Sequence, residues 1–323
     1  MVPLQNGSNA KLIGVDWGTS SFRAYLMSGH GDVLQEIKST SGILSVGDGD
    51  FAAVLREAIG LLTGDNHDLP IVMCGMIGSK QGWREAVYLN GSATPFALAK
   101  SSLFVSGFGQ PVWIVPGLVS SGSLSGIPDV MRGEETIMIG AMAGQEKPDG
   151  WYCLPGTHSK WICVSDGKIQ DFSTHLTGEA FGIVKKHSIV TPLIESQQSK
   201  DFSKSSFLAG VELAGKKGGL LNHVFQLRSG YLTGVLEDNS LADMLSGLMI
   251  GAELHASKDR CGVLQAPVRL FSAGEISKRY ELAMEQLGME FEGYDAEMAC
   301  CAGLFEIGSI LESNQALVME ETA

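Results

Sequence analysis

Two stretches of this sequence share one layout: KLIGVDWGTSSFRAYLMSGHGDV at residues 11–33 and WYCLPGTHSKWICVSDGKIQ at residues 151–170. Each contains an apolar run, a Gly-Thr turn, a second apolar run, a glycine turn and a third run. This pattern predicts a meander of strands joined by tight turns. At an offset of 138 residues, identical residues coincide and pair Gly18, Thr19, Ser21 and Gly29 with Gly156, Thr157, Ser159 and Gly167. The repeat indicates an internal duplication.

Helical patterns follow each copy of the meander. Residues 50–62 (DFAAVLREAIGLL) begin with an Asp cap and space their apolar residues at about 3.6 per turn, and residues 241–257 are similar. A strand and a helix are expected at 268–287, and a last helix at 295–312. Strands followed by alternating helices and strands, twice over, predict a duplicated α/β architecture. We expect the boundary at 144–150, a polar stretch with Pro and Gly.

The composition is that of a globular chain with a sizeable core, because 44% of the residues are hydrophobic and 18% are charged. The sequence contains no apolar run of about 18 residues or more, so no membrane span is predicted. The N-terminus does not resemble a signal peptide. We expect residues 1–10 to be a flexible tail. The net charge of −13 argues against a nucleic-acid partner, so an anionic substrate would need local positive charge. Scattered cysteines without a CxxC pair favour free thiols in the cytoplasm.

The Gly-Thr turn of the first copy carries groups that suit phosphate. Asp16 precedes the turn, which consists of Gly18, Thr19, Ser20 and Ser21. Backbone N–H groups beside a glycine can approach phosphate oxygens, and hydroxyls add donors. A carboxylate at a strand end suits Mg²⁺, which takes one or two protein carboxylates. A plain glycine hairpin with an Asp cap is the alternative, and the second copy of the turn argues against it.

The second copy keeps the turn but has Leu154 where the first has Asp16. We therefore expect the two halves to have specialised, with the metal-associated carboxylate in the first. The second offers donors for phosphate, and its candidate residues are Gly156, Thr157, His158 and Ser159. A packed or exposed histidine remains the alternative for His158.

Residues 71–84 (IVMCGMIGSKQGWR) are an apolar strand that runs into a glycine-rich loop with polar side chains. Donors on such a loop suit recognition of a carboxylate and hydroxyls. The candidate substrate-binding residues are Gly78, Ser79, Lys80, Gln81, Trp83 and Arg84. The alternative is a surface loop with solvated Lys and Arg.

Residues 131–143 (MRGEETIMIGAMA) place Glu134 and Glu135 at the start of an apolar helix. The helix dipole alone favours acids there. One of them is also a candidate for the general base that accepts the proton of an acceptor hydroxyl. Glu179, in HLTGEAF, is the competing carboxylate and a candidate substrate contact. We prefer Glu134, because it directly follows Gly133 at the helix start.

Residues 272–275 (SAGE) lie between an apolar strand and an amphipathic helix. A turn of small residues there would let an adenine or a ribose approach the backbone. The weak motif gains meaning from its position in the second half, where the candidate adenosine-binding residues are Ser272, Ala273 and Gly274.

The strings GVDWGTSSFRAYL, GMIGSKQGW, LPGTHSKW and LTGEAF, in this order, resemble the bacterial 2-dehydro-3-deoxygalactonokinase family over residues 11–312. The resemblance implies two actin-like, ribonuclease-H-like lobes with a ligand cleft between them. The lobe at 11–147 would hold the first phosphate loop and the sugar-acid site, and the lobe at 148–323 the second phosphate loop and the adenosine site. The implied reaction is phosphoryl transfer from ATP, with Mg²⁺, to 2-dehydro-3-deoxy-D-galactonate, giving the 6-phosphate.

The resemblance matches Asp16–Ser21 to the first phosphate loop and Leu154–Ser159 to the second, where Leu154 departs from the superfamily's usual carboxylate. It does not choose among Glu134, Glu135 and Glu179 as the base. The implied partners are a sugar acid and ATP, without nucleic acid or membrane, and the oligomeric state stays open, a homodimer included. A phosphohydrolase and a non-catalytic sugar- or nucleotide-binding regulator on the same fold are the alternatives.

Overall fold

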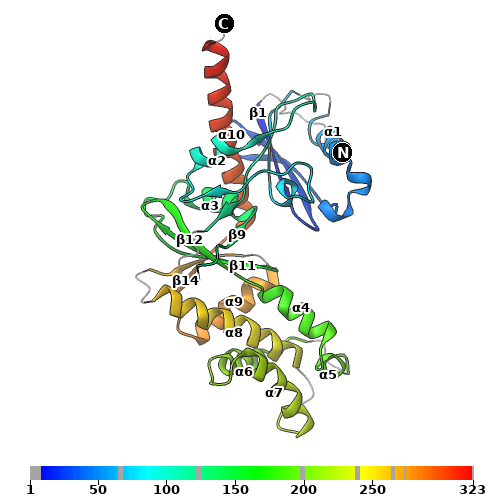
Figure 1. Ribbon diagram of the computed structural model, residues 1–323, viewed down its shortest axis with the longest axis vertical. Coiled ribbons are helices and arrows are strands. Elements are labelled where there is room, and N and C mark those ends of the chain that lie inside the picture. The colour runs from blue at the N-terminus through cyan, green and yellow to red at the C-terminus, as the bar shows by residue number, and fades with distance from the viewer. Residues whose placement is uncertain are drawn as a thin grey trace. The chain divides into compact units, whose positions relative to one another are not determined.

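The computed structural model describes residues 9–64, 68–120, 126–196, 201–236, 241–262, 266–272 and 274–321. Residues 1–8 of the expected tail and Ala273 of the expected adenosine site therefore lie outside the described residues. The chain forms two compact units (Figure 1). One consists of Met1–Asp149, Val164–Asp171 and Ala296–Ala323, and the other of Gly150–Cys163 and Phe172–Asp295.

The first unit is built on a mixed sheet that contains the predicted meander. In spatial order its strands are β3 (Val33–Ser39), β2 (Phe22–Ser28), β1 (Ala10–Trp17), β4 (Ile71–Cys74), β7 (Val112–Ile114) and β6 (Leu103–Phe104). Strands β1, β2 and β3 pair antiparallel, whereas β4 runs parallel to both β1 and β7. A smaller sheet contains β5 (Leu89–Asn90), β8 (Leu118–Val119) and β9 (Val130–Met131).

The second sheet repeats this strand order. Its members are β12 (Lys168–His175), β11 (Ser159–Ser165), β10 (Gly150–Leu154), β13 (Val268–Phe271) and β14 (Phe291–Tyr294). Strand β13 runs parallel to β10 and β14, as β4 does to β1 and β7. The tip of the β11–β12 hairpin belongs to the first unit, where Ile169 forms a β-bridge with Ala93. The predicted duplication is confirmed, because the same topology occurs twice.

The helices of the first unit are α1 (Phe51–Thr63), α2 (Pro95–Ser101), α3 (Glu134–Met142) and α10 (Ala296–Glu321). Helix α1 confirms the helix expected at 50–62, and the carboxylate of Asp50 caps it by accepting from the Ala53 N–H at 2.9 Å. The apolar face of α1 packs on β2 and β3 and buries Leu55, Ile59 and Leu62. Short 3₁₀ turns occur at η2 (Ile43–Ser45), η3 (Gly47–Gly49) and η4 (Met76–Gly78).

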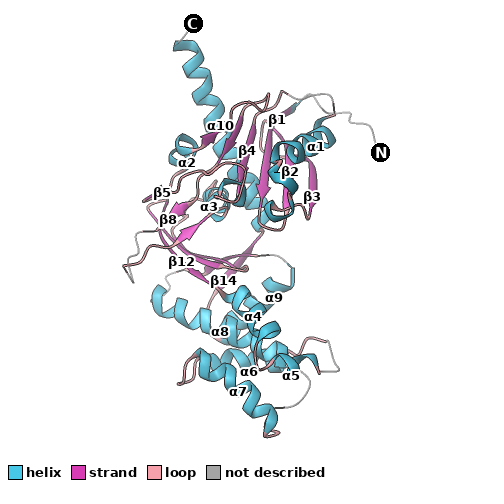
Figure 2. Cartoon of the chain, turned by 45° about the vertical axis from the view of Figure 1, so that its right-hand side comes forward, coloured by secondary structure: helices cyan, strands magenta, loops and turns pink. Residues whose placement is uncertain are grey.

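The second unit is organised around one long helix, α8 (Leu241–Cys261), which is labelled in Figure 2. Its helices are α4 (Thr177–His187), α5 (Thr191–Glu195), α6 (Lys204–Ala214), α7 (Leu220–Leu232), α8 (Leu241–Cys261) and α9 (Gly274–Gln286). Helix α8, which confirms the helix expected at 241–257, contacts each of the others. Within the described segments, none of the helices combines the length and apolarity that a bilayer span requires.

The last helix corrects the expected domain division. The second lobe was expected to extend to residue 323, but α10 packs on α3 and β1 of the first unit. The reason is a close helix crossing, because a Cβ atom at Gly140 would lie 1.8 Å from the Ala299 carbonyl oxygen and one at Gly303 would lie 1.9 Å from that of Thr136. Only glycine allows backbones to approach so closely.

Candidate active site

Asp16 lies at the carboxyl end of β1, in a row of residues that crosses the first sheet. The strand register places Lys38 beside Arg23, Arg23 beside Asp16, and Asp16 beside Cys74 of β4. Arg23 Nη1 forms an ion pair with Asp16 Oδ2 at 2.8 Å. Burial raises the pKa of the Asp16 carboxyl, Arg23 opposes that rise, and the charges of Glu134 and Glu297 add to it. The predicted carboxylate is thus held half-buried beside a cation and near two further acids.

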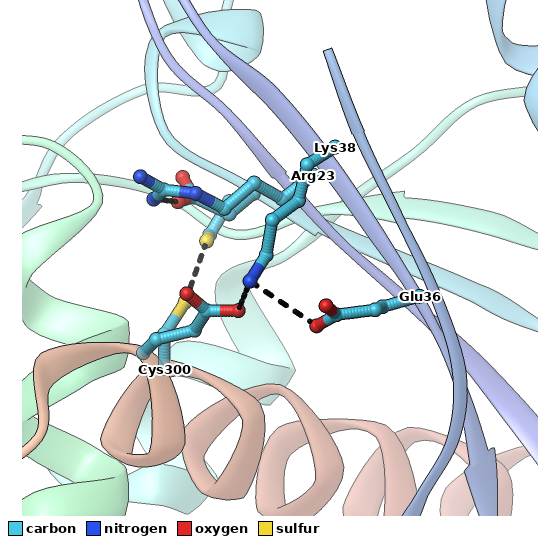
Figure 3. Close-up of polar contacts among 7 residues, drawn as sticks. Arg23, Glu36, Lys38 and Cys300 are labelled. Carbon is cyan, nitrogen blue, oxygen red and sulfur yellow. Dashed lines mark hydrogen bonds and ion pairs between the residues drawn. The ribbon is translucent and has the colours of Figure 1, made fainter.

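Helix α10 contributes further contacts to this row of residues (Figure 3). Glu297 of α10 accepts from the Lys38 ammonium at 2.7 Å, and Glu36 pairs with the same ammonium at 3.3 Å. The Sγ atoms of Cys74 and Cys300 lie 3.9 Å apart in the buried contact between β4 and α10. The C-terminal helix therefore shapes the surroundings of Asp16, which sequence reasoning did not anticipate.

The first Gly-Thr turn forms a compact loop with an exposed tip. The Gly18 N–H donates to the Ser21 carbonyl at 2.8 Å, which closes the turn. From behind, the N–H groups of Ile43 and Leu44 donate to the carbonyls of Gly18 and Thr19 at 3.0 and 3.3 Å. The side chains of Thr19 and Ser20 are exposed. The loop is thus held by backbone hydrogen bonds while its hydroxyls face outward.

Glycines bring two further segments up to Asp16. Gly75, which follows β4, has φ +90°, and a Cβ atom there would lie 2.8 Å from the Trp17 carbonyl oxygen and 3.4 Å from Asp16 Oδ1. Gly133 has φ +108°, and its Cβ would lie 3.3 Å from the Cα of Gly75. These close contacts place the start of α3, with Glu134, near Asp16.

The two candidate bases at the start of α3 have different surroundings. Glu135 is 0% exposed and accepts from the Gly133 N–H at 2.7 Å and the Thr136 hydroxyl at 3.1 Å. Burial raises its pKa to about 8, and the neighbouring charge of Glu134 adds to the rise. Glu134 is only partly buried, and its Oε2 accepts from the Arg132 N–H at 3.0 Å. Of the two, Glu134 is the one that solvent can reach.

The loop at 75–84 divides into supporting and exposed residues. Gly78 is buried, and Trp83 packs against Phe108 with ring centroids 5.7 Å apart. Trp83 is partly buried, so these two candidates contribute packing within the loop, and their substrate contacts stay a prediction. Lys80, Gln81 and Arg84 are exposed on the loop, and Ser79 is partly so. A charged substrate group could be met by these exposed donors.

The second Gly-Thr turn also has an exposed tip on a buried base. Thr157 and His158 are exposed, and His158 Nε2 is in hydrogen-bond contact with Glu179 Oε2. Ser159 is 0% exposed, and its hydroxyl lies 2.9 Å from that of Tyr280. The competing base Glu179 is thus paired with the candidate phosphate contact His158.

The remaining candidates of the second unit lie where β13 meets α9. Gly274 begins α9 with φ +65°, and Ser272 precedes it. The buried Ser272 hydroxyl has no hydrogen-bond partner among the residues described. The adenosine assignment of these residues stays a prediction.

Two supporting glycines escaped sequence reasoning. A Cβ at Gly42 would lie 2.3 Å from the Thr19 carbonyl oxygen, and one at Gly178 would lie 2.6 Å from that of Gly156. Both follow the third strand of their meander, because β3 ends at Ser39 and β12 ends at His175. The repeat could not have indicated them, because its offset of 138 residues pairs Gly42 with Ala180 and not with Gly178.

The donor set near Asp16 suits a hard cation with few protein ligands. Among the described residues, no group of three or more His, Cys, Asp and Glu side chains could hold a metal ion. Mg²⁺ bound with a nucleotide needs only one or two carboxylates, because water and phosphate oxygens complete its shell. Asp16, with Glu134 near enough to raise its pKa, meets that requirement.

Two named relatives match nearly the whole chain. A protein of Rhizobium meliloti (strain 1021) named "Probable 2-dehydro-3-deoxygalactonokinase" is 33% identical over 294 residues, which cover 90% of this chain and 94% of that protein. The 2-dehydro-3-deoxygalactonokinase of Escherichia coli (strain K12) is 32% identical over 300 residues, which cover 92% of this chain and 97% of that protein.

Solved structures extend the comparison to the fold. The crystal structure of a "putative 2-dehydro-3-deoxygalactonokinase protein" from Sinorhizobium meliloti has a TM-score of 0.82 and 32% identity, covering 92% of this chain and 97% of that one. The activator of 2-hydroxyisocaproyl-CoA dehydratase from Clostridium difficile, solved with ADPNP, has a TM-score of 0.51 at 12% identity, with 94% and 97% covered. This second likeness concerns the fold alone. The family model of 2-keto-3-deoxy-galactonokinase matches residues 16–307, and the chain belongs to this family.

Proposed function

We propose that this protein transfers the terminal phosphoryl group of ATP to the 6-hydroxyl of 2-dehydro-3-deoxy-D-galactonate. The observation that carries the proposal is the pair of Gly-Thr loops, each exposed at the end of its central strand, in a chain that belongs to the 2-keto-3-deoxy-galactonokinase family. Backbone N–H groups and hydroxyls on such loops suit phosphate oxygens. The consumption of ATP and the free cysteines favour a cytoplasmic enzyme.

In this proposal the first loop and Asp16 serve the transferred phosphate. Thr19 and Ser20 would donate to its oxygens, whereas the Gly18 N–H closes the turn by donating to the Ser21 carbonyl. Asp16, with its nearby acid Glu134, would hold Mg²⁺, which neutralises charge on the phosphates. Arg23 keeps the Asp16 carboxylate oriented through the ion pair at 2.8 Å. Thr157 and His158 of the second loop would bind the remaining phosphates, with Glu179 orienting the His158 ring.

Glu134 is the proposed general base. Phosphoryl transfer to a primary alcohol releases a proton late in the reaction, and a carboxylate within hydrogen-bond reach can accept it. Glu134 is accessible and fixed by the Arg132 N–H, whereas Glu135 is enclosed. The site would thus divide the work between Asp16 for the metal and Glu134 for the proton.

The exposed donors of the 75–84 loop are the proposed contacts of the sugar acid. Lys80 and Ser79 would bind its carboxylate, with Arg84 as a helper, because charge-assisted hydrogen bonds to a carboxylate are strong and directional. Ser272 and Gly274 would lie along the adenosine.

The test is an ADP-release assay coupled to product analysis, across 2-keto-3-deoxy acids that include the C4 epimer and across neutral sugars. We expect ATP consumption to require a 2-keto-3-deoxy acid and to yield one phosphorylated acid for each ADP. ADP release without a phosphorylated acid would replace the proposal with the phosphohydrolase alternative. A preference for neutral sugars would overturn the substrate class.

A further inference from the structure

Glu253 is a carboxylate enclosed within the second unit, on the buried face of α8, and only 3% exposed. Trp161 Nε1 donates to Glu253 Oε1 at 2.8 Å. The hydroxyls of Tyr280 and Thr177 both donate to Oε2, Tyr280 at 2.7 Å. A buried carboxylate is costly unless donors satisfy it, and these three come from β11, α9 and α4.

The hydrogen bonds run in one direction from the second Gly-Thr loop to Glu253. Tyr280 has a single hydroxyl hydrogen, which it gives to Glu253, so its oxygen accepts from the Ser159 hydroxyl at 2.9 Å. Ser159 Oγ in turn accepts from the Gly156 N–H at 3.4 Å. The hydroxyl of Ser159 therefore makes both of these hydrogen bonds in the interior and links the loop to Tyr280.

A second route reaches the same loop through α4. Thr177, the first residue of that helix, is anchored to Glu253 through its hydroxyl. The next residue, Gly178, packs against the Gly156 carbonyl, and the Glu179 N–H donates to the Thr157 carbonyl at 3.0 Å. Both faces of the loop are thus tied to one buried carboxylate that does not touch it.

We propose that Glu253 is a positioning residue that holds the second Gly-Thr loop in the shape that binds the phosphates of ATP. An apolar side chain at this buried position of α8 would avoid the cost of burying a carboxylate, and such a replacement often increases stability. The directed bonds to Ser159 and Thr177 are what an apolar residue would not supply. The inference rests on the proposed function, in which this loop binds nucleotide.

The test compares Tyr280→Phe, which deletes only the hydroxyl between Ser159 and Glu253, with Glu253→Gln, which places an amide opposite donors. The control is Asp259→Asn, because Asp259 is an exposed acid on the same helix. The affinity for ADP and for a non-hydrolysable ATP analogue is measured by calorimetry without sugar acid. KM values for both substrates and thermal melting are measured in parallel.

We expect Tyr280→Phe and Glu253→Gln each to weaken nucleotide binding about 10-fold, which is the loss expected when one hydrogen bond is removed. The KM for the acid should stay within about twofold of the parent value. Asp259→Asn should bind as the parent does. Should Glu253→Gln not fold, Tyr280→Phe decides alone. Unchanged nucleotide affinity in folded Tyr280→Phe, or an equal rise in both KM values, overturns the inference. A parent protein that binds ATP but phosphorylates no sugar acid refutes the proposed function and leaves this test intact.

Discussion

Gly42→Ala tests whether the first Gly-Thr loop owes its position to the segment behind it. Gly42 has φ −64° and ψ 171°, which alanine adopts without strain, so the effect of the substitution is purely steric. The new Cβ would lie 2.3 Å from the Thr19 carbonyl oxygen and 2.4 Å from the Ser20 nitrogen. Ordinary contact begins at 3.4 Å, so the loop must retreat by about 1 Å.

A displacement of about 1 Å in a positioning element costs about 10²-fold in rate, or roughly 2.7 kcal/mol of transition-state stabilisation. The overpacking itself costs about 1–3 kcal/mol of folding stability. The assay is ADP release with varied ATP and sugar acid, alongside thermal unfolding. The control is Gly47→Ala, because Gly47 is not buried and an added Cβ atom there would meet no described neighbour within 4 Å. A folded Gly42→Ala protein with kcat within about twofold of the parent would refute the reasoning.

Four further changes probe the remaining assignments. Asp16→Asn should lower kcat by about 10²-fold, and added Mg²⁺ should not restore it; normal turnover would remove Asp16 from the mechanism. Lys80→Ala should raise the KM for the acid about 10-fold and spare that for ATP, with Lys100→Ala as a surface control. Glu134→Gln should bind both substrates yet turn over about 10²-fold more slowly, a result that full activity would contradict. The raised pKa of Glu135, about 8 against 4.5, means that the folded state retains a proton which the unfolded state releases. Folding stability should therefore fall between about pH 4.5 and 8, and Glu135→Gln should abolish that decline in denaturant titrations.

The sequence predicted the parts of the fold that depend on local chemistry. Alternating apolar residues and glycine turns specify a meander wherever they occur, so the repeat at 11–33 and 151–170 identified both central sheets. The placement of α10 depends instead on a close backbone contact between Gly140 and Gly303. No local sequence pattern indicates which unit a helix will join.

The sequence also predicted the part of the candidate site that depends on local chemistry. Glycine and hydroxyl residues in the turns indicated the two loops, and the structure leaves Thr19 and Thr157 at least partly exposed on them. The surroundings of other candidates could not be predicted, because the Trp83 ring and the Ser159 hydroxyl suit a ligand as well as the interior. In the structure the ring packs against Phe108 and the hydroxyl is buried beside Tyr280. Which neighbour contacts each side chain depends on the tertiary fold.

The return of α10 to the first unit has a consequence for the order in which the chain folds during synthesis. Domains usually fold in the order in which the ribosome releases them, starting from the N-terminus. Here the sheet that carries Asp16 receives its covering helix only from residue 296 onward, whereas the whole of the second unit lies between Gly150 and Asp295. On the ribosome the internal unit can therefore be completed first. The β1 and α3 surfaces that α10 covers stay exposed until α10 emerges.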